Sequence, residues 1–236
     1  MEDTPHVLKK IGWRVILGFV LYTLLMPMVL FLAAGTFNWI MAWSYVIIII
    51  GFMVLSRIIV IHQNPELARE RAKFIKAENA CELDRIIVFV SVIIGPLIMF
   101  IVAGLDRRFS WSPQISPSMQ VLALIILIAG FLITSWAMIA NTFFSAVVRI
   151  QKERHHRVIK NGPYRFIRHP GYVGSFISIG VTPIVLGSVW AFIPVIFMVI
   201  LGVLRTSLED KTLQDELEGY EKYTQEVPFR LIPGIW

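Results

Sequence analysis

Long apolar runs alternate with shorter polar segments along the chain. The apolar runs cover residues 11–34, 38–61, 85–105, 119–141, 173–186 and 189–204. A helix needs about twenty apolar residues to cross the hydrocarbon core of a bilayer. The runs are continuous rather than alternating, which excludes a transmembrane barrel. We therefore predict an all-α integral membrane protein with about six transmembrane helices in one membrane domain.

The turns between these runs predict some of the packing. The first two runs are separated by a minimal turn, so we expect a tight hairpin, with Trp39, Trp43 and Tyr45 at a membrane interface. Gly95-Pro96 predicts a kink in the third run. The run at 173–186 is short, which predicts a tilted or partly re-entrant helix.

Two charged segments are predicted to be helical. Residues 62–84 mix acidic and basic side chains, with Asn64 and Pro65 suited to a helix start, and form either a surface helix or a lid. Residues 206–226 form an acidic amphipathic helix, followed by a proline-containing tail. We expect its solvated face to carry four acidic residues, which are Asp210, Glu216, Glu218 and Glu221.

Composition and charge agree with a multi-pass membrane protein. Hydrophobic residues make up 56% of the chain and charged residues 16%, and the mean hydropathy is +0.70. With both termini in the cytoplasm, every Lys and Arg except Arg107 and Arg108 lies on the cytoplasmic side, as the positive-inside rule requires. This bias accounts for the net charge of +6 without a nucleic-acid partner. The single cysteine, Cys81, excludes an internal disulfide.

The longest polar run, residues 149–172, is the first candidate for chemistry, and we call it the basic segment. It carries three of the five histidines and lies between apolar runs. Its glycines and prolines predict an irregular backbone whose polar groups need partners at a membrane edge. Tyr164 and Tyr172 offer aromatic faces that attract a cation, and His169 can donate or accept a hydrogen bond. Each of these residues also has an ordinary structural explanation when taken singly.

A second candidate is the pair Arg205 and Glu209, four residues apart at the inner end of the last run. This spacing places both on one helix face. Ionisable groups where a helix leaves the membrane indicate a site, although a surface ion pair is the simpler alternative. His155-His156 lacks the cysteines or carboxylates of a zinc site, so we expect no metal.

These residues form a pattern that resembles a known family. Gly162-Pro163-Tyr164, the sequence RHPGYVG at 168–174, an apolar hairpin and the sequence RTSLED at 205–210 occur in that order. Gly219-Tyr220, Tyr223 and Val227-Pro228 follow. The set resembles the isoprenylcysteine carboxyl methyltransferase family, and RHPxY alone is shared with phospholipid methyltransferases and sterol reductases.

The resemblance implies a membrane-embedded methyltransferase that uses S-adenosyl-L-methionine. Residues 1–141 would then be N-terminal transmembrane helices, and 142–236 a methyltransferase-like region with a cytoplasmic cofactor-binding loop and C-terminal helix. Arg205 would be catalytic and would face the methyl acceptor. The implied cofactor-binding residues are Gln151, His156, Arg157, Val158, Ile159, Tyr164, His169, Pro170, Gly171, Tyr172 and Glu209.

The acceptor implied by the resemblance is a lipophilic molecule that enters from the bilayer. Carboxyl O-methylation of an isoprenylcysteine-like or other lipid substrate is the expected reaction. A phospholipid amine or a small isoprenoid acid would also fit. Two other functions stay open: a sterol-reductase-like NADPH-dependent membrane reductase, and a non-enzymatic membrane carrier or assembly protein.

Overall fold

The computed structural model describes residues 13–63, 66–67, 82–145 and 147–236, and all regular elements in these ranges are helical. The longer helices are α2 (Trp13–Ala34), α3 (Ile40–Gln63), α5 (Glu82–Phe89), α6 (Gly95–Phe109), α7 (Pro117–Ala140), α8 (Pro170–Val185) and α9 (Phe192–Glu216). The shorter elements are η2 (Val90–Ile94), η3 (Lys152–Arg154), η4 (Gly162–Arg165) and α10 (Tyr220–Glu226). The predicted all-α membrane fold is confirmed.

Five helical segments are long and apolar enough to cross a membrane, counting α5, η2 and α6 as one. The sixth predicted span, α8, is apolar but shorter. Most of the charged stretch at 62–84, including Asn64, Pro65 and Cys81, lies outside the described residues. The expected lid or surface helix there stays a prediction.

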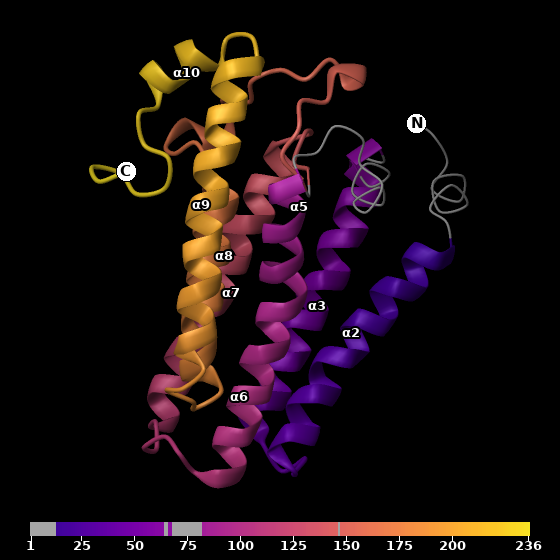
Figure 1. Ribbon diagram of the computed structural model, residues 1–236, viewed down its shortest axis with the longest axis vertical. Helices are drawn as coiled ribbons and strands as arrows, with labels where there is room; N and C mark the ends of the chain where they lie inside the picture. Colours follow the sequence, from indigo (N-terminus) through magenta and orange to yellow (C-terminus); the bar gives the residue numbers. More distant parts are fainter. Residues whose placement is uncertain (1–12, 64–65, 68–81, 146) are drawn as a thin grey trace.

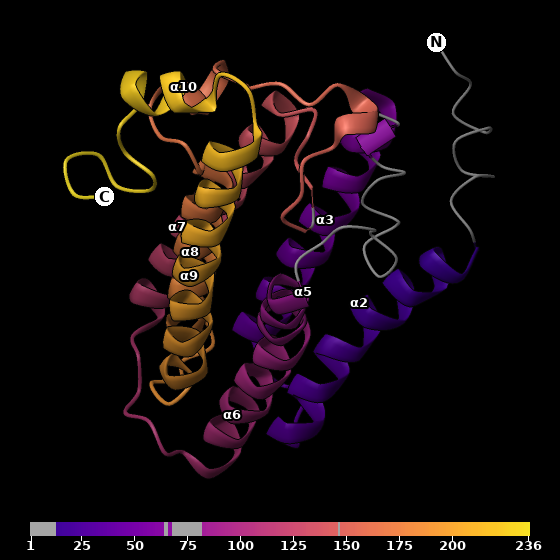
Figure 2. The same cartoon turned by 45° about the horizontal axis from the view of Figure 1, so that its top comes forward.

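The long helices run side by side, and the connecting segments gather at the two ends of the bundle (Figure 1). One end carries the basic segment, α10 and the C-terminus, and we call it the loop end. The other end carries residues 35–39, 110–116 and 186–191. Turning the molecule keeps α7, α8 and α9 together, while α2 leans away from them (Figure 2).

Helices α7 and α8 make the closest packing in the bundle, through small residues. A Cβ atom on Gly130 of α7 would lie 2.7 Å from the carbonyl oxygen of Gly174 in α8. Ser178 adds a hydrogen bond of 3.2 Å to the Leu127 carbonyl across the same contact. Small residues let helix backbones approach closely in lipid. This contact fixes the start of α8, where the RHPGY sequence lies.

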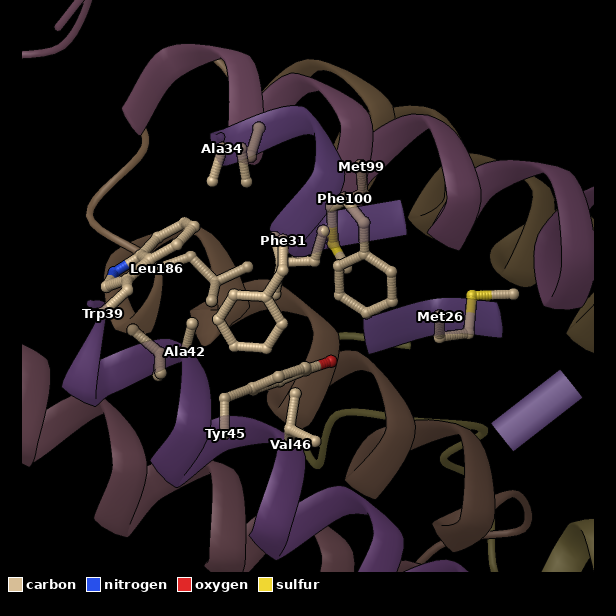
Figure 3. Close-up of a cluster of buried hydrophobic side chains, with 14 of the residues drawn as sticks. Met26, Phe31, Ala34, Trp39, Ala42, Tyr45, Val46, Met99, Phe100 and Leu186 are labelled. Carbon is tan, nitrogen blue, oxygen red and sulfur yellow. The ribbon is translucent and has the colours of Figure 1, made fainter. Parts of the chain in front are cut away.

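The main apolar core contains residues of all the long helices from α2 to α9 except α5, and Figure 3 shows part of it. Trp39 and Tyr45 are buried in this cluster, and the Tyr45 ring meets Phe100 edge-on at 5.8 Å. Trp43 is exposed. The burial of Trp39 and Tyr45 fills the seam between helices with large aromatic rings, and their placement at a membrane interface stays a prediction. The predicted tight hairpin was wrong, because α2 packs mainly against α6 and α3 mainly against α7.

At Gly95-Pro96, where a kink was predicted, a π-helical turn, η2, leads into α6. The Gly95 amide donates to the Val90 carbonyl five residues earlier. Pro96 has no amide hydrogen to give to the Val92 carbonyl. The Tyr22 hydroxyl of α2 donates to that carbonyl at 2.7 Å instead. A side chain from a neighbouring helix thus satisfies the backbone group that the proline leaves free.

A buried carboxylate ties two loops together at the end opposite the basic segment. Asp106 of α6 is 2% exposed. It accepts hydrogen bonds from the Ser112 amide at 2.7 Å and from the Ser112 and Ser188 hydroxyls, both at 2.5 Å. Because hydrogen-bonded carboxylates tolerate burial, Asp106 can join the α6–α7 and α8–α9 connections.

The last span and the first part of the C-terminal helix form one continuous helix, α9. The prediction that a separate helix begins at residue 206 was therefore wrong. No glycine or proline lies between Gly202 and Leu217 to interrupt the helix. The break falls at Gly219, with a φ of 79°, and α10 follows it. The charged end of α9 consequently extends the bundle at the loop end.

Candidate active site at the loop end

The basic segment folds back on itself as an elbow before α8. Gly162, with a φ of 59°, starts η4 and leaves space for the side chains of Ala140 and Trp136 of α7. Tyr164 in η4 is buried, and Asn141 donates to its hydroxyl at 3.2 Å. Pro170 then occupies the first turn of α8, where its missing amide hydrogen costs nothing.

The elbow meets α9 through Tyr172 and Glu209. The Tyr172 hydroxyl donates to the Glu209 carboxylate at 2.6 Å. The Arg205 guanidinium lies over the Tyr172 ring, 5.6 Å from its centroid. The structure therefore brings three of the predicted site residues together, from two segments that are separated by a helical hairpin. Arg205 and Glu209 each contact Tyr172 rather than forming a simple surface ion pair.

Asp84, near the start of α5, is a member of this cluster that sequence reasoning missed. It is 1% exposed and accepts a hydrogen bond from Arg205 Nε at 2.7 Å. Its other carboxylate oxygen accepts from the Val148 amide, also at 2.7 Å. An acidic residue directly before Arg85, at the start of a predicted membrane span, was the available signal.

Asp210 is the most highly connected carboxylate at the loop end, and its predicted place on a solvated face was wrong. It is 0% exposed and pairs with three cationic or potentially cationic groups, Arg168, His169 and Arg230, at 2.8–3.1 Å. Tyr220 and Gln214 also donate to it, at 3.0 and 2.7 Å. The helix period turns Asp210 inward, whereas Glu216, Glu218 and Glu221 are exposed as predicted.

The C-terminal tail covers the elbow from outside. The amides of Arg168 and His169 donate to the carbonyls of Phe229 and Arg230, both at 3.0 Å. The Tyr223 hydroxyl of α10 donates to the Tyr164 carbonyl at 2.6 Å. The conformation of the elbow therefore depends on residues about sixty positions later in the chain.

The upstream part of the basic segment is built around a buried amide. Gln151 is 0% exposed, and its side chain donates to the Phe143 carbonyl at 2.8 Å and accepts from Arg154 at 2.5 Å. The His156 ring lies 4.4 Å from the Phe143 ring. Gln151 thus holds the segment together, and a contact between Gln151 and a cofactor stays a prediction.

The other predicted cofactor residues differ in their exposure. Arg157 is exposed, Ile159 is half-buried, and Pro170 and Gly171 are buried. Val158 packs against the apolar cluster that α10 forms with the end of α9. The predicted cofactor residues that keep partly accessible side chains are His156, Arg157, Val158, Ile159, Tyr172 and Glu209.

Burial sets the protonation of two groups in this region. Burial, together with the nearby Arg154 charge, lowers the pKa of His156 to about 4, although the Glu209 carboxylate acts in the opposite direction. His156 is consequently neutral near pH 7 and can accept a hydrogen bond. Burial raises the pKa of the Tyr164 phenol, so Tyr164 also stays neutral.

An apolar cavity of about 500 Å³ lies between α9 and the segment formed by η2 and α6. Its lining includes Val90, Ile94, Ile98, Trp190, Ile193 and Phe197, and several of these side chains are exposed on the outer surface of the bundle. Arg205 lies on α9, and Asp84 lies on α5, which leads directly into η2; both are nearer the loop end than the cavity. An apolar surface therefore lies beside the helices that carry the polar site.

The fold and this site define a multi-pass membrane protein with a polar, charged site at one end of an apolar bundle. Residues 122–215 match the model of the Isoprenylcysteine carboxyl methyltransferase (ICMT) family, which confirms the family resemblance for this part of the chain. The matched residues include the elbow, Tyr172, Arg205, Glu209 and Asp210.

Similar proteins carry the corresponding names. The chain is 32% identical to the protein-S-isoprenylcysteine O-methyltransferase of Schizosaccharomyces pombe over 114 aligned residues. The aligned residues make up 46% of this chain and 48% of that protein. It is 41% identical over 59 residues to protein-S-isoprenylcysteine O-methyltransferase A of Arabidopsis thaliana, which corresponds to 24% of this chain and 30% of that protein. A probable protein-S-isoprenylcysteine O-methyltransferase of Oryza sativa subsp. indica is 42% identical over 55 residues, which corresponds to 23% of this chain and 29% of that protein. The chain thus spans about half or less of these relatives.

Proposed function

We propose that this protein is an S-adenosyl-L-methionine-dependent methyltransferase that acts on the carboxylate of an isoprenylcysteine-like lipid. The observation that carries the proposal is the Tyr172–Glu209 hydrogen bond, with Arg205 over the same ring. It joins the two sequence motifs of the family resemblance in one cluster. The family match and the names of the relatives support the same reaction.

The residues around Tyr172 fit the chemistry of the methyl donor. When bound, S-adenosyl-L-methionine supplies a methyl group on a positively charged sulfur, together with an ammonium and a carboxylate. Glu209 offers a carboxylate to cationic groups, and the Tyr172 ring attracts a cation through its face. Arg157 is exposed on the basic segment and can attract an anionic group, whereas Lys160 is paired with Glu226 at 2.6 Å. The site therefore offers partners for each charged part of the donor.

Arg205 is the residue that we assign to the acceptor. A guanidinium binds a carboxylate through paired, charge-assisted hydrogen bonds. A carboxylate acceptor is already ionised near neutral pH, so the reaction needs no general base. The contribution of the chain is then to orient the acceptor and exclude water.

The apolar cavity supports a lipophilic acceptor that arrives from the bilayer. Its lining is hydrocarbon and aromatic, and it flanks α9 below Arg205. A prenyl-like chain placed along α9 would keep its polar head near the loop end. The excess of Lys and Arg at the loop end favours a cytoplasmic location for it, where a water-soluble donor is available.

A methyl-transfer assay tests this proposal. Purified protein in lipid nanodiscs is given a radiolabelled methyl donor with N-acetyl-S-farnesyl-cysteine, its methyl ester, or a total lipid extract. We expect base-labile label on the free carboxylate and none on the ester. Arg205→Ala should abolish turnover while binding of S-adenosylhomocysteine is retained. Labelling of phospholipid amines alone would overturn the carboxylate assignment, and full turnover by Arg205→Ala would overturn the role of Arg205.

The two alternative functions give different results with the same preparation. A sterol-reductase-like enzyme would bind NADPH and neither S-adenosyl compound. A non-enzymatic carrier or assembly protein would bind none of the three. Either result would reject methyl transfer as the function.

A further inference from the structure

The Asp84 carboxylate connects Arg205, the proposed acceptor residue, to Val148, the residue directly before the basic segment. One oxygen accepts from Arg205 Nε at 2.7 Å, and the other accepts from the Val148 amide at 2.7 Å. The three residues come from α5, α9 and the connection after α7. A single buried side chain therefore holds three parts of the chain in register.

Burial restricts the orientation of the Asp84 carboxylate and of the Arg205 guanidinium that it contacts. Asp84 is 1% exposed, and the Arg205 side chain is 17% exposed. A buried carboxylate with a donor on each oxygen has little freedom to turn, because losing either donor leaves a charge unsatisfied. The Nε contact from Asp84 fixes one edge of the guanidinium, and the Tyr172 ring covers one face. The plane and direction of the guanidinium are thereby set.

Resting on the proposed function, we propose that Asp84 is a positioning residue for methyl transfer: it aims the Arg205 guanidinium at the acceptor carboxylate and, through Val148, holds the basic segment against that arginine. Asp84 itself is not expected to touch acceptor or donor. Arg205 contacts Tyr172, which is hydrogen-bonded to Glu209. The Asp84 contacts thus link the acceptor side of the site to its donor side.

The replacement Asp84→Asn tests this role with little change in shape. An asparagine has one acceptor oxygen and cannot satisfy both donors. We expect the KM for the farnesyl acceptor to rise about tenfold or more, as for loss of a charge-assisted hydrogen bond, and kcat to fall. The Kd for S-adenosylhomocysteine should change less than about threefold, because Glu209 and Tyr172 keep their contact. The double variant D84N/R205A should lose no more acceptor binding than R205A alone.

Asp106→Asn is the matched control, since Asp106 is equally buried, accepts several hydrogen bonds and lies at the other end of the bundle. It should lower thermal stability without changing the acceptor KM. Equal KM changes in D84N and D106N, or a wild-type KM in D84N, would overturn the proposal.

Hydrogen exchange gives a readout that does not depend on turnover. The amides of residues 147–151 should exchange at least about tenfold faster in D84N than in wild type and be unchanged in D106N. If wild-type protein methylates none of the acceptors, the proposed function fails, and this exchange measurement decides separately whether Asp84 links the two segments. Unchanged exchange in D84N would reject that link.

Discussion

The imidazole Nε2 of His169 lies 3.0 Å from Oδ1 of Asp210, and the two side chains are 4% and 0% exposed. The histidine of the HPGY sequence is therefore turned toward a buried carboxylate of α9. Asp210 also forms ion pairs with Arg168 and Arg230, so it joins the elbow, α9 and the C-terminal tail. This contact makes His169 a positioning residue for the elbow, and its direct contact with a cofactor stays a prediction.

Asp210→Asn should destabilise the loop end strongly. The variant keeps the volume but leaves two arginines beside a neutral amide, and breaking a buried ion pair costs about 3–5 kcal/mol. We expect a lower thermal midpoint in detergent and faster proteolysis of the segment after α9. Asp215→Asn, on an exposed position of the same helix, should behave like wild type. Equal thermal midpoints for the two variants would contradict the prediction that Asp210 stabilises the loop end.

The contact between α7 and α8 depends on the absence of a side chain at Gly174. A Cβ there would meet the Gly130 carbonyl and the Thr134 backbone amide, so Gly174→Ala must push the helices apart. We expect a loss of about 1–3 kcal/mol, typical of overpacking. Gly180→Ala is the control on the same helix, because a Cβ at Gly180 meets nothing within 4 Å. Chemical denaturation of both variants in one detergent checks this, and a larger loss in Gly180→Ala would refute it.

The low pKa of His156 gives the folded protein a defined pH dependence. The unfolded chain takes up a proton on His156 as the pH falls through 6.5, whereas burial lowers the pKa in the folded chain to about 4. Folded-state stability should therefore decrease from pH 6.5 to about 4 and be unaffected by this group at higher pH.

Thermal midpoints measured across that pH range test this effect. His156→Asn should show a weaker decrease than wild type. The exposed neighbour His155, which has a φ of 51°, is the control, because asparagine tolerates this left-handed conformation. His155→Asn should follow the wild-type profile. A wild-type profile for His156→Asn would show that His156 does not titrate as described.

The apolar pattern predicted the helices well because each long run must satisfy its backbone internally in lipid. Five of the predicted spans correspond to long helices, and α8 is the short helix that the run at 173–186 indicated. The pattern could not predict which helices pack together. Trp39, for example, lies in the core, and its burial depends on neighbours that are distant in sequence.

The site was predicted where its residues lie within a motif, and missed where contacts are remote. Tyr172, Arg205 and Glu209 were named from the motifs, and the structure brings them together. Asp84 precedes Arg205 by more than one hundred residues, and local spacing does not indicate that pairing. Asp210 was assigned, with three later acidic residues, to the solvated face of the C-terminal helix. Each residue turns a helix position by about 100°, and Asp210 faces the buried side.

Titration calorimetry with S-adenosylhomocysteine is the most direct test of the site, using wild-type protein and the variants Glu209→Gln and Glu216→Gln. Both glutamates lie on α9, and Glu216 is exposed and remote from Tyr172. We expect wild type and Glu216→Gln to bind with the same Kd, and Glu209→Gln to bind about tenfold or more weakly, as for loss of a charged hydrogen-bond partner. Wild-type affinity in Glu209→Gln, or heat from NADPH and none from S-adenosylhomocysteine, would contradict a methyl-donor site at the loop end.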